Sequence, residues 1–396
     1  MALKNVFIPY GGYWSSPFIK WQGSISHLHS GVLAADTAKR WLASRQISAE
    51  GFDSISLGWT VPQKQIFYGA PWIAGLIGAP GISGPMYAQA CATGARVLAG
   101  SAHEIETGFK SCILGLTFDR CSNGAHVVYP NPMGPGATVD AENWVWDNFG
   151  HDPYAKNSML QTAENVAKEA GISREEQDEC ALIRNGQYQQ TLANDRAFQK
   201  RYMFPLEIAA GKQSKVIETD EGVFPTTKEG LAKLKPVLPD GTVTFGAQTY
   251  PADGNAGVIV TTKDRAAELA RDKSITVQVL SFGQCRVKKG FMPMAPVPAA
   301  KQALEAAGLA LKDVKVIKTH NPFAVNDVYF AKQNGLKLDA FNNYGSPLVF
   351  GHPQGPTGLR VIIEMIEELA QAGGGHGLFT GCAAGDSAMS CVVKVS

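Results

Sequence analysis

Residues 89–117, QACATGARVLAGSAHEIETGFKSCILGLT, contain the pattern that decides the fold class. A cysteine among small residues precedes a helical pattern over 94–107, and an apolar run of strand length follows at 113–117. Further strand candidates are 257–262, 314–318, 378–380 and 391–395, and further helical patterns are 263–271, 298–307 and the amphipathic 358–371. Strands that alternate with helices predict an α/β protein with layered sheets.

The middle of the chain, residues 121–249, differs from both ends. It is richer in polar and charged residues and has amphipathic helical patterns at 159–170 and 174–193. We interpret it as an insertion on an α/β core rather than as more sheet. The length of 396 residues suits two or three domains in total.

The composition argues against several classes of protein. With 36 Lys and Arg against 35 Asp and Glu, the net charge is +1, so no overall field attracts nucleic acid or an anionic membrane. The most apolar stretch, residues 71–82, is shorter than the roughly 18–20 residues of a membrane helix, and residues 1–10 lack a secretory signal pattern. We therefore expect a cytoplasmic protein without nucleic-acid or membrane partners.

The seven cysteines are scattered without a C-x-x-C pair or a histidine ligand pattern, so neither a disulfide framework nor a metal site is expected. Cys91 stands apart because it lies where a helix is predicted to begin. Backbone N–H groups and the positive end of the helix dipole favour the thiolate there, which predicts a nucleophile. The alternative is the ordinary role of an isolated cysteine, a small buried apolar side chain.

Three further side chains that can exchange protons lie on turns. His352 occupies a rigid Gly- and Pro-rich loop, where it can act as a base toward a distant cysteine, donate to an oxyanion, or simply close a turn. Cys382 follows an apolar run on a turn of small residues, where a thiol can move protons. His320 follows another strand candidate and offers a second imidazole. The combination is more specific than any single member.

These segments resemble those of the thiolase family, and the resemblance extends over essentially the whole chain. The turn at Cys91 is similar to the nucleophile segment of that family. The stretch Gly351-His352-Pro353-x-Gly355-x-x-Gly358 is similar to its histidine loop, Gly381-Cys382 to its second-cysteine loop, 162–167, 171–178 and 234–236 to its loop domain, and 253–257 to the return into the core.

The resemblance implies a five-layered α/β/α/β/α fold made of two similar halves with an inserted loop domain. The N-terminal half is 1–120, completed by 250–270, and the C-terminal half is 271–396. The CoA-binding loop domain is 121–249. The resemblance also implies a homodimer or a dimer of dimers, with coenzyme A as co-substrate and no permanently bound cofactor.

The same resemblance implies a role for each candidate catalytic residue. His352 deprotonates Cys91, whose thiolate attacks the keto carbon of a 3-oxoacyl-CoA, and Cys382 protonates the departing enolate. Free CoA then removes the acyl group from Cys91; the reverse reaction is a Claisen condensation. One oxyanion site is formed by His352 with His320, or a water that it holds, and the other by the backbone N–H groups of Cys91 and Ala384.

Candidate CoA contacts also follow from the resemblance. The matching positions are Ser158, Met159, Thr249 and Phe323, with Ala384 narrowing the pocket, and the alternative is that these are ordinary core or loop residues. Lys200, Arg201, Lys212 and Lys215 are candidates for the CoA phosphates, although exposed lysines are more often only solvated.

One departure from the common family pattern concerns His320, which stands where most members have asparagine. It is similar to the sterol-carrier-type branch, whose members often act with a small OB-fold, zinc-ribbon subunit. Some of them process branched or aromatic substrates such as benzoylsuccinyl-CoA. Aromatic residues that could line a matching pocket or interface, or simply pack, are Tyr10, Tyr13, Trp14, Phe18, Trp21, Trp144, Trp146 and Phe149.

Two alternatives remain beside the thiolase. Cys91, His320 and His352 alone would suit a ketosynthase-like enzyme that condenses with decarboxylation. Such an enzyme does not need the acid/base thiol of Cys382, so its presence favours thiolysis or non-decarboxylative condensation. The third candidate is a non-catalytic acyl-CoA-binding subunit, against which all four candidate catalytic residues argue.

Overall fold

The computed structural model of the protein describes residues 2–210 and 213–396. Within them eleven strands form one mixed sheet, and the others form two separate hairpins. The order along the sheet is β13 (Val314–His320), β14 (Gly375–Ala383), β15 (Ser387–Val395), β12 (Val277–Arg286), β1 (Phe7–Ile8), β11 (Ala252–Thr261), β6 (Cys112–Arg120), β4 (Ser54–Gly58) and β5 (Met86–Tyr87). The short strands β2 (Tyr13–Ser15) and β3 (Ile19–Lys20) also pair with β11.

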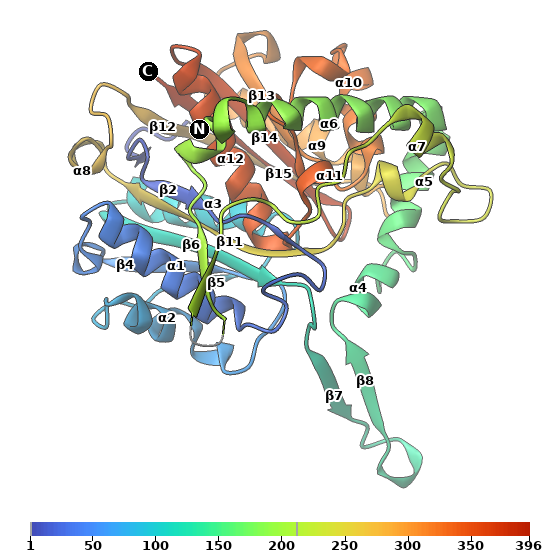
Figure 1. The fold of residues 1–396 in the computed structure, drawn as a ribbon, viewed down its shortest axis with the longest axis horizontal. Coiled ribbons are helices and arrows are strands. Elements are labelled where there is room, and N and C mark those ends of the chain that lie inside the picture. The colour runs from blue at the N-terminus through green and yellow to red at the C-terminus, as the bar shows by residue number, and fades with distance from the viewer. Residues whose placement is uncertain (1, 211–212) are drawn as a thin grey trace.

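The sheet has two halves, joined by β1, which pairs antiparallel with both β11 and β12. Helices α3 (Thr93–Glu106) and α12 (Gln354–Gln371) lie between the halves, and α12 packs on strands of both (Figure 1). Helices α1 (Ser30–Ser44) and α2 (Gly69–Ile77) cover the N-terminal half, and α9 (Pro296–Ala307) and α10 (Ala324–Asn334) cover the C-terminal half. The expected five-layered α/β/α/β/α fold is confirmed.

Alternating side chains separate these layers. On the last two strands Leu378 and Val392 face the α9 and α10 cluster, whereas Phe379 and Cys391 face the central helices. Because successive strand residues point to opposite faces, a strand buried on both sides reads as a continuous apolar run. This accounts for the strand candidates at 113–117, 257–262, 314–318, 378–380 and 391–395, all of which fall within or overlap β6, β11, β13, β14 and β15.

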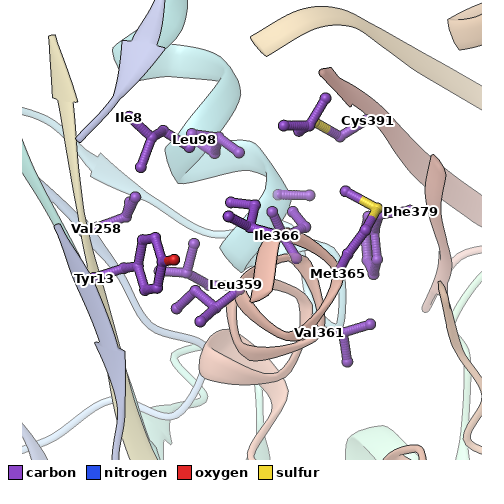
Figure 2. Close-up of a cluster of buried hydrophobic side chains, with 14 of the residues drawn as sticks. Ile8, Tyr13, Leu98, Val258, Leu359, Val361, Met365, Ile366, Phe379 and Cys391 are labelled. Atoms are coloured by element: carbon purple, nitrogen blue, oxygen red, sulfur yellow. The ribbon is translucent and has the colours of Figure 1, made fainter. Parts of the chain in front are cut away.

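The central core is built around α12, as Figure 2 shows with Leu359, Met365 and Ile366 among side chains from both halves. A Cβ atom at Gly94 would lie only 2.6 Å from the backbone nitrogen of Leu359 and 2.8 Å from the carbonyl oxygen of Gly355. The absence of a side chain at this position therefore lets α3 approach the start of α12.

The amphipathic helix expected at 358–371 is present within α12, which is buried on nearly every side. Its charged residues face a buried ionic network instead of solvent. Arg360 binds both oxygens of Asp220 at 2.7 and 2.8 Å and also pairs with Glu364. Glu367 accepts hydrogen bonds from the hydroxyls of Tyr10 and Tyr13. A polar residue inside a packed helix needs such partners, which periodicity alone does not reveal.

Between 121 and 249 none of the described strands joins the main sheet. The elements are β7 (His126–Pro130), β8 (Val139–Asn143), α4 (Trp146–Gly150), α5 (Met159–Glu169), α6 (Arg174–Arg196), β9 (Leu206–Ala210), β10 (Gln213–Ile217) and α7 (Lys228–Ala232). The β7–β8 hairpin extends away from the body of the molecule (Figure 1). Ser173 begins α6 with a capping box to Glu176, and both predicted helices of this region are present.

The remaining helices are α8 (Lys263–Leu269), directly after β11, and α11 (Pro347–Phe350), directly before the loop of His352. All seven cysteines are free. None of the described helices combines the length and the apolar character that crossing a bilayer requires.

Candidate active site

Four loops at the ends of strands and helices bring the predicted catalytic residues together. His320 ends β13 and Cys382 lies next to the end of β14; these strands are parallel, with His320 paired to Gly381. Cys91 lies two residues before α3, and His352 lies two residues before α12. Because α3 and α12 are in contact, residues distant in the chain meet at one point. The ligand atoms of Cys91, His320 and His352 all lie within 4.8 Å of one another.

The backbone of His352 is held by the N-terminal half of the sheet. Its N–H donates to the carbonyl of Tyr250 at 3.0 Å, and its carbonyl accepts from the N–H of Ala252 at the start of β11. The preceding Gly351 has φ +87°, a conformation that side chains disfavour, and a Cβ atom there would lie 2.6 Å from the Tyr250 ring. Gly351 therefore allows both the turn before His352 and the close approach of this loop to the Tyr250 ring.

The hydrogen bonds of Thr357 define the protonation of the His352 ring. The Thr357 hydroxyl donates its only proton to the carbonyl oxygen of Pro353 at 2.6 Å. It must therefore accept from Nδ1 of His352, which lies 2.7 Å away. Nδ1 carries the proton, and Nε2, which has no hydrogen-bond partner among the described residues, has a free lone pair. The imidazole is oriented to accept a proton.

His320 is fully buried, and neither of its ring nitrogens has a hydrogen-bond partner among the described residues. Its ring centroid lies 4.2 Å from that of His352. Burial lowers the pKa of His320 to about 3, and burial together with His320 lowers the pKa of His352 well below its usual value. Both rings are therefore neutral near neutral pH. Buried nitrogens without partners are rare in folded proteins and are available to a ligand.

The expectation that the helix start favours the Cys91 thiolate needs correction. Two backbone N–H groups, those of Cys91 and Ala384, do lower the pKa of the Cys91 thiol, but desolvation outweighs them and raises it to about 12. Helix-dipole effects are worth only about 0.3–1 kcal/mol at most exposed sites, whereas burial shifts a pKa by several units. The resting residue is a neutral thiol, so a base must remove its proton during attack.

Cys382 is fully buried beside Asn326, whose side-chain amide donates to its sulfur at 3.2 Å. Desolvation is the main cause that raises its pKa well above the usual value, and the neighbouring Cys91 adds to the effect. Cys382 is thus also a neutral thiol that can deliver a proton. The Asn326 amide favours the thiolate that remains after this delivery.

Asp119, near the end of β6 in the N-terminal half, holds the loop of His352 through a hydrogen bond to Gly355. Its carboxylate accepts from the N–H of Gly355 at 2.6 Å, from the N–H and hydroxyl of Thr60 at 2.8 Å each, and from the N–H of Val61 at 2.9 Å. Burial raises its pKa to about 6 despite these donors. Asp119 was not among the predicted site residues, and no local motif in the sequence indicates that it meets Gly355.

Of the residues predicted to contact CoA, Met159 and Phe323 lie in the apolar cluster around Cys382. Ser158 caps α5 by accepting from the N–H of Gln161, and Met159 packs against the apolar cluster that contains Phe323 and Cys382. Thr249 donates its hydroxyl to the carbonyl of Pro347 at 2.6 Å. The fifth residue, Ala384, directs its N–H toward the sulfur of Cys91. That these residues contact CoA stays a prediction.

Three of the four residues predicted to contact the CoA phosphates have partners within the protein. Lys200 forms an ion pair with Asp195, Arg201 binds the buried Glu367 at 2.7 Å, and Lys215 donates to the hydroxyl of Ser24. Lys212 lies outside the described residues.

The aromatic residues divide into two groups. Tyr10, Tyr13, Trp14 and Phe18 are at most 2 % exposed and belong to the interior, so packing is their role. The second group forms a separate cluster in which the rings of Trp21 and Trp146 lie 5.0 Å apart. Its members are Trp21, Val61, Cys121, Trp144, Val145 and Phe149, with Trp146 against them.

Comparisons with known proteins agree with this fold. The chain matches the family descriptions "Thiolase, N-terminal domain" over residues 14–264 and "Thiolase, C-terminal domain" over residues 273–395. It is 28% identical to a mitochondrial 3-ketoacyl-CoA thiolase of Homo sapiens over 400 residues, which cover 99% of this chain and 98% of the relative. It is 30% identical to an acetyl-CoA acetyltransferase of Syntrophomonas wolfei over 77% of this chain and 78% of the relative.

Among solved structures, human mitochondrial 3-ketoacyl-CoA thiolase in complex with CoA superimposes with a TM-score of 0.90 at 26% identity. The superposition covers 100% of this chain and 99% of that one. The chain belongs to the thiolase family, and it is an enzyme of the acyltransferase class.

Proposed function

We propose that the protein cleaves a 3-oxoacyl-CoA with free CoA, or runs the reverse Claisen condensation, through an acyl group on Cys91. The observation that carries the proposal is the meeting of Cys91 with the free lone pair of His352 and with two backbone N–H groups. A nucleophile, a base and oxyanion donors within one cluster are the requirements of acyl transfer.

In the first half-reaction His352 Nε2 takes the proton of Cys91 as its sulfur attacks the keto carbon. Because the resting thiol has a pKa of about 12 and the imidazole is a weak base, the transfer is coupled to attack rather than completed before it. The oxyanion receives hydrogen bonds from His352, then protonated, and from the His320 ring. Breakage of the carbon–carbon bond leaves an acyl-Cys91 thioester and an enolate of the released acyl-CoA.

Cys382 gives its proton to the α-carbon of that enolate, and Asn326 holds the sulfur that remains. In the second half-reaction the thiol of free CoA gives its proton to the Cys382 thiolate and attacks the thioester on Cys91, while the N–H groups of Cys91 and Ala384 stabilise the thioester oxyanion. The Cys91 sulfur then leaves and takes back the proton that His352 holds. Loss of one such donor typically raises the barrier by about 2.7–4 kcal/mol. Read in reverse, Cys382 removes a proton from the α-carbon and the resulting carbanion attacks acyl-Cys91.

CoA is the co-substrate in this proposal, bound by residues 121–249 as a loop domain between halves 1–120 (with 250–270) and 271–396. Supporting it is the apolar cluster of Met159, Phe323 and Cys382, which suits the pantetheine arm leading to the reacting thioester. Ser158 and Thr249 retain oxygen lone pairs that can accept from its amides.

A branched or aromatic acyl group is the finer substrate proposal. The cluster of Trp21, Trp144 and Trp146 is linked to the site, because the Trp144 indole donates to the carbonyl of Thr60 at 2.8 Å. The hydroxyl of Thr60 in turn lies 2.6 Å from the side-chain oxygen of Gln354, two residues beyond His352. A kinetic survey of linear, branched and aromatic 3-oxoacyl-CoA esters tests this; equal preference for linear chains would contradict it.

Three further expectations remain proposals. His320 supports the sterol-carrier-type branch, and with it a small OB-fold, zinc-ribbon partner besides a homodimer or dimer of dimers. Co-purification of the untagged protein with mass determination tests both. The location is proposed to be the cytoplasm; one relative, of Rattus norvegicus, is a cytosolic acetyl-CoA acetyltransferase, and others are mitochondrial.

The test of the activity is CoA-dependent loss of acetoacetyl-CoA. We expect Cys91→Ala to abolish it, and Cys285→Ala, at a partly exposed cysteine outside the cluster, to retain it. Cys382→Ala separates the alternatives, because a decarboxylating condensing enzyme would keep its activity on a malonyl thioester without this thiol. Full activity of Cys91→Ala would contradict the mechanism, and saturable acyl-CoA binding without turnover by the wild type would favour a binding subunit.

A further inference from the structure

The active site brings together three side chains that can bind a soft or borderline metal ion. A thiol and two neutral imidazoles converge with their ligand atoms within 4.8 Å of one another. Both nitrogens of His320 and Nε2 of His352 lack partners among the described residues, and both rings are buried. Thiolate with imidazole is the donor set that selects Zn²⁺ over Mg²⁺ or Ca²⁺.

The spacing is close to that of a zinc site. Zn–N bonds of about 2.0–2.1 Å and Zn–S bonds of about 2.3 Å place tetrahedral ligand atoms about 3.3–3.6 Å apart. The ligand atoms lie up to 4.8 Å apart, so zinc binding would require them to approach one another by up to about 1.5 Å through rotation of the side chains. The ring of His352 is already prepared, because a metal-binding histidine usually donates its second N–H to a fixed acceptor, here Thr357.

We propose that Cys91, His320 and His352 form a Zn²⁺ site that blocks the nucleophile reversibly. Binding replaces the thiol proton, so that one S–H bond is exchanged for one Zn–S bond and a proton is released to solvent. The ion takes the lone pairs of both imidazoles, and a water occupies the fourth position. No electron transfer is involved, and a chelator restores the free thiol.

The proposal departs from the sequence-based expectation of no metal site. No spacing motif in the sequence indicates this site, because its ligands come from three separate places in the chain: the end of β13 and the loops before α3 and α12. It also implies that acylation and metal binding exclude each other. An acyl-Cys91 thioester has no proton to release and its sulfur is a poor ligand, so the acylated protein is protected from Zn²⁺.

The test uses the whole chain without added cofactors. Co²⁺ serves as a spectroscopic probe, because a tetrahedral cobalt–thiolate site has a near-ultraviolet charge-transfer band. Zn²⁺ should remove this band at one equivalent and should protect Cys91 from alkylation, as read by peptide mass. The expected result is a band in the wild type and in Cys285→Ser, and none in Cys91→Ser. This readout needs no catalytic activity, so it remains valid if the proposed function fails.

The matched ligand variant is His320→Asn. It should weaken Zn²⁺ binding by more than the roughly 10–100-fold that loss of an outer partner of a ligand costs. Its circular dichroism and unfolding midpoint establish that it folds. Mg²⁺ should neither compete with Co²⁺ nor protect Cys91. A charge-transfer band that persists in Cys91→Ser, or an unchanged Zn²⁺ affinity in His320→Asn, would overturn the proposal.

Discussion

Helix α12 carries two kinds of buried polar group, and they contrast in how they are satisfied. Along its length Arg360 and Glu367 are enclosed by partners, with Asp220 on one and Arg201 and Arg271 on the other. Just before its start, His352 has one ring nitrogen held by Thr357 and the other free, beside His320, which has no partner. Paired groups build a rigid frame, whereas the unpaired ones form the reactive point that the frame positions.

The largest expected effect is the loss of stability when a paired buried charge on α12 loses its partner. Arg360→Met leaves Asp220 and Glu364 buried without their cation, which typically costs about 3–5 kcal/mol. Denaturant unfolding measures it. The control is Arg40→Met, because Arg40 pairs at the surface with Asp36 and Glu207 and such pairs contribute about 0–1 kcal/mol. Equal losses in the two variants would contradict the distinction.

The second effect concerns the unpaired imidazole of His320, which should make the free energy of unfolding depend on pH. His320 has a pKa of about 3 when folded and an ordinary value of 6.5, so below pH 6.5 the unfolded chain binds a proton that the folded chain does not. The free energy of unfolding therefore falls as the pH drops from 6.5 toward 3, by up to about 1.4 kcal/mol per pH unit for this group.

The measurement compares wild type with His320→Asn between about pH 4 and 8. Asp119 and Asp253, whose pKa values burial raises to about 6, titrate in this window with the opposite sign, and they are common to both proteins. The difference between the two curves reports the titration of His320 together with its effect on His352, whose pKa His320 helps to lower. A difference that does not change with pH would mean that the ring is charged, or solvated, in the folded protein.

The smallest effect concerns Thr357, a positioning residue for His352. Thr357→Val removes one hydrogen bond and the preference for the Nδ1–H form, worth about 0.5–1.5 kcal/mol, so kcat should fall roughly 2- to 10-fold while KM stays. Thr357→Ser keeps the hydroxyl and should restore the rate. If Ser and Val behave alike, the hydroxyl does not orient the ring.

Sequence patterns predict the fold and the candidate catalytic residues because these depend on local signals. Gly, Pro or polar residues flank each of these segments within a few positions. The segments are the Cys91 turn, the loop of His352 and the apolar runs at 113–117 and 378–380. Thr357 lies within the stretch Gly351–Gly358, but its contact with His352 depends on side-chain direction, as does the contact of Asn326 with Cys382, and the local sequence does not show this direction.

What could not be predicted depends on long-range burial. The neutral state of Cys91 follows from desolvation by both halves, which outweighs the helix start that a sequence displays. The charges of α12 meet Asp220 and Tyr10 from distant segments, and the amphipathic pattern of this helix does not reveal these partners. Asp119 meets Gly355 across 236 positions, and neither residue carries a local sign of the contact.

The division of work between the two cysteines is the central claim, and acylation by acetyl-CoA without CoA tests it most directly. Transfer of the acetyl group to Cys91 needs His352 as the base, but it involves no proton transfer to or from the α-carbon, which is the role proposed for Cys382. The account predicts one acetyl group on Cys91 in the wild type and in Cys382→Ala, and a much slower gain in His352→Asn, all read by intact and peptide mass. Acetyl found on another residue, or acylation in Cys91→Ala at the wild-type rate, would contradict it.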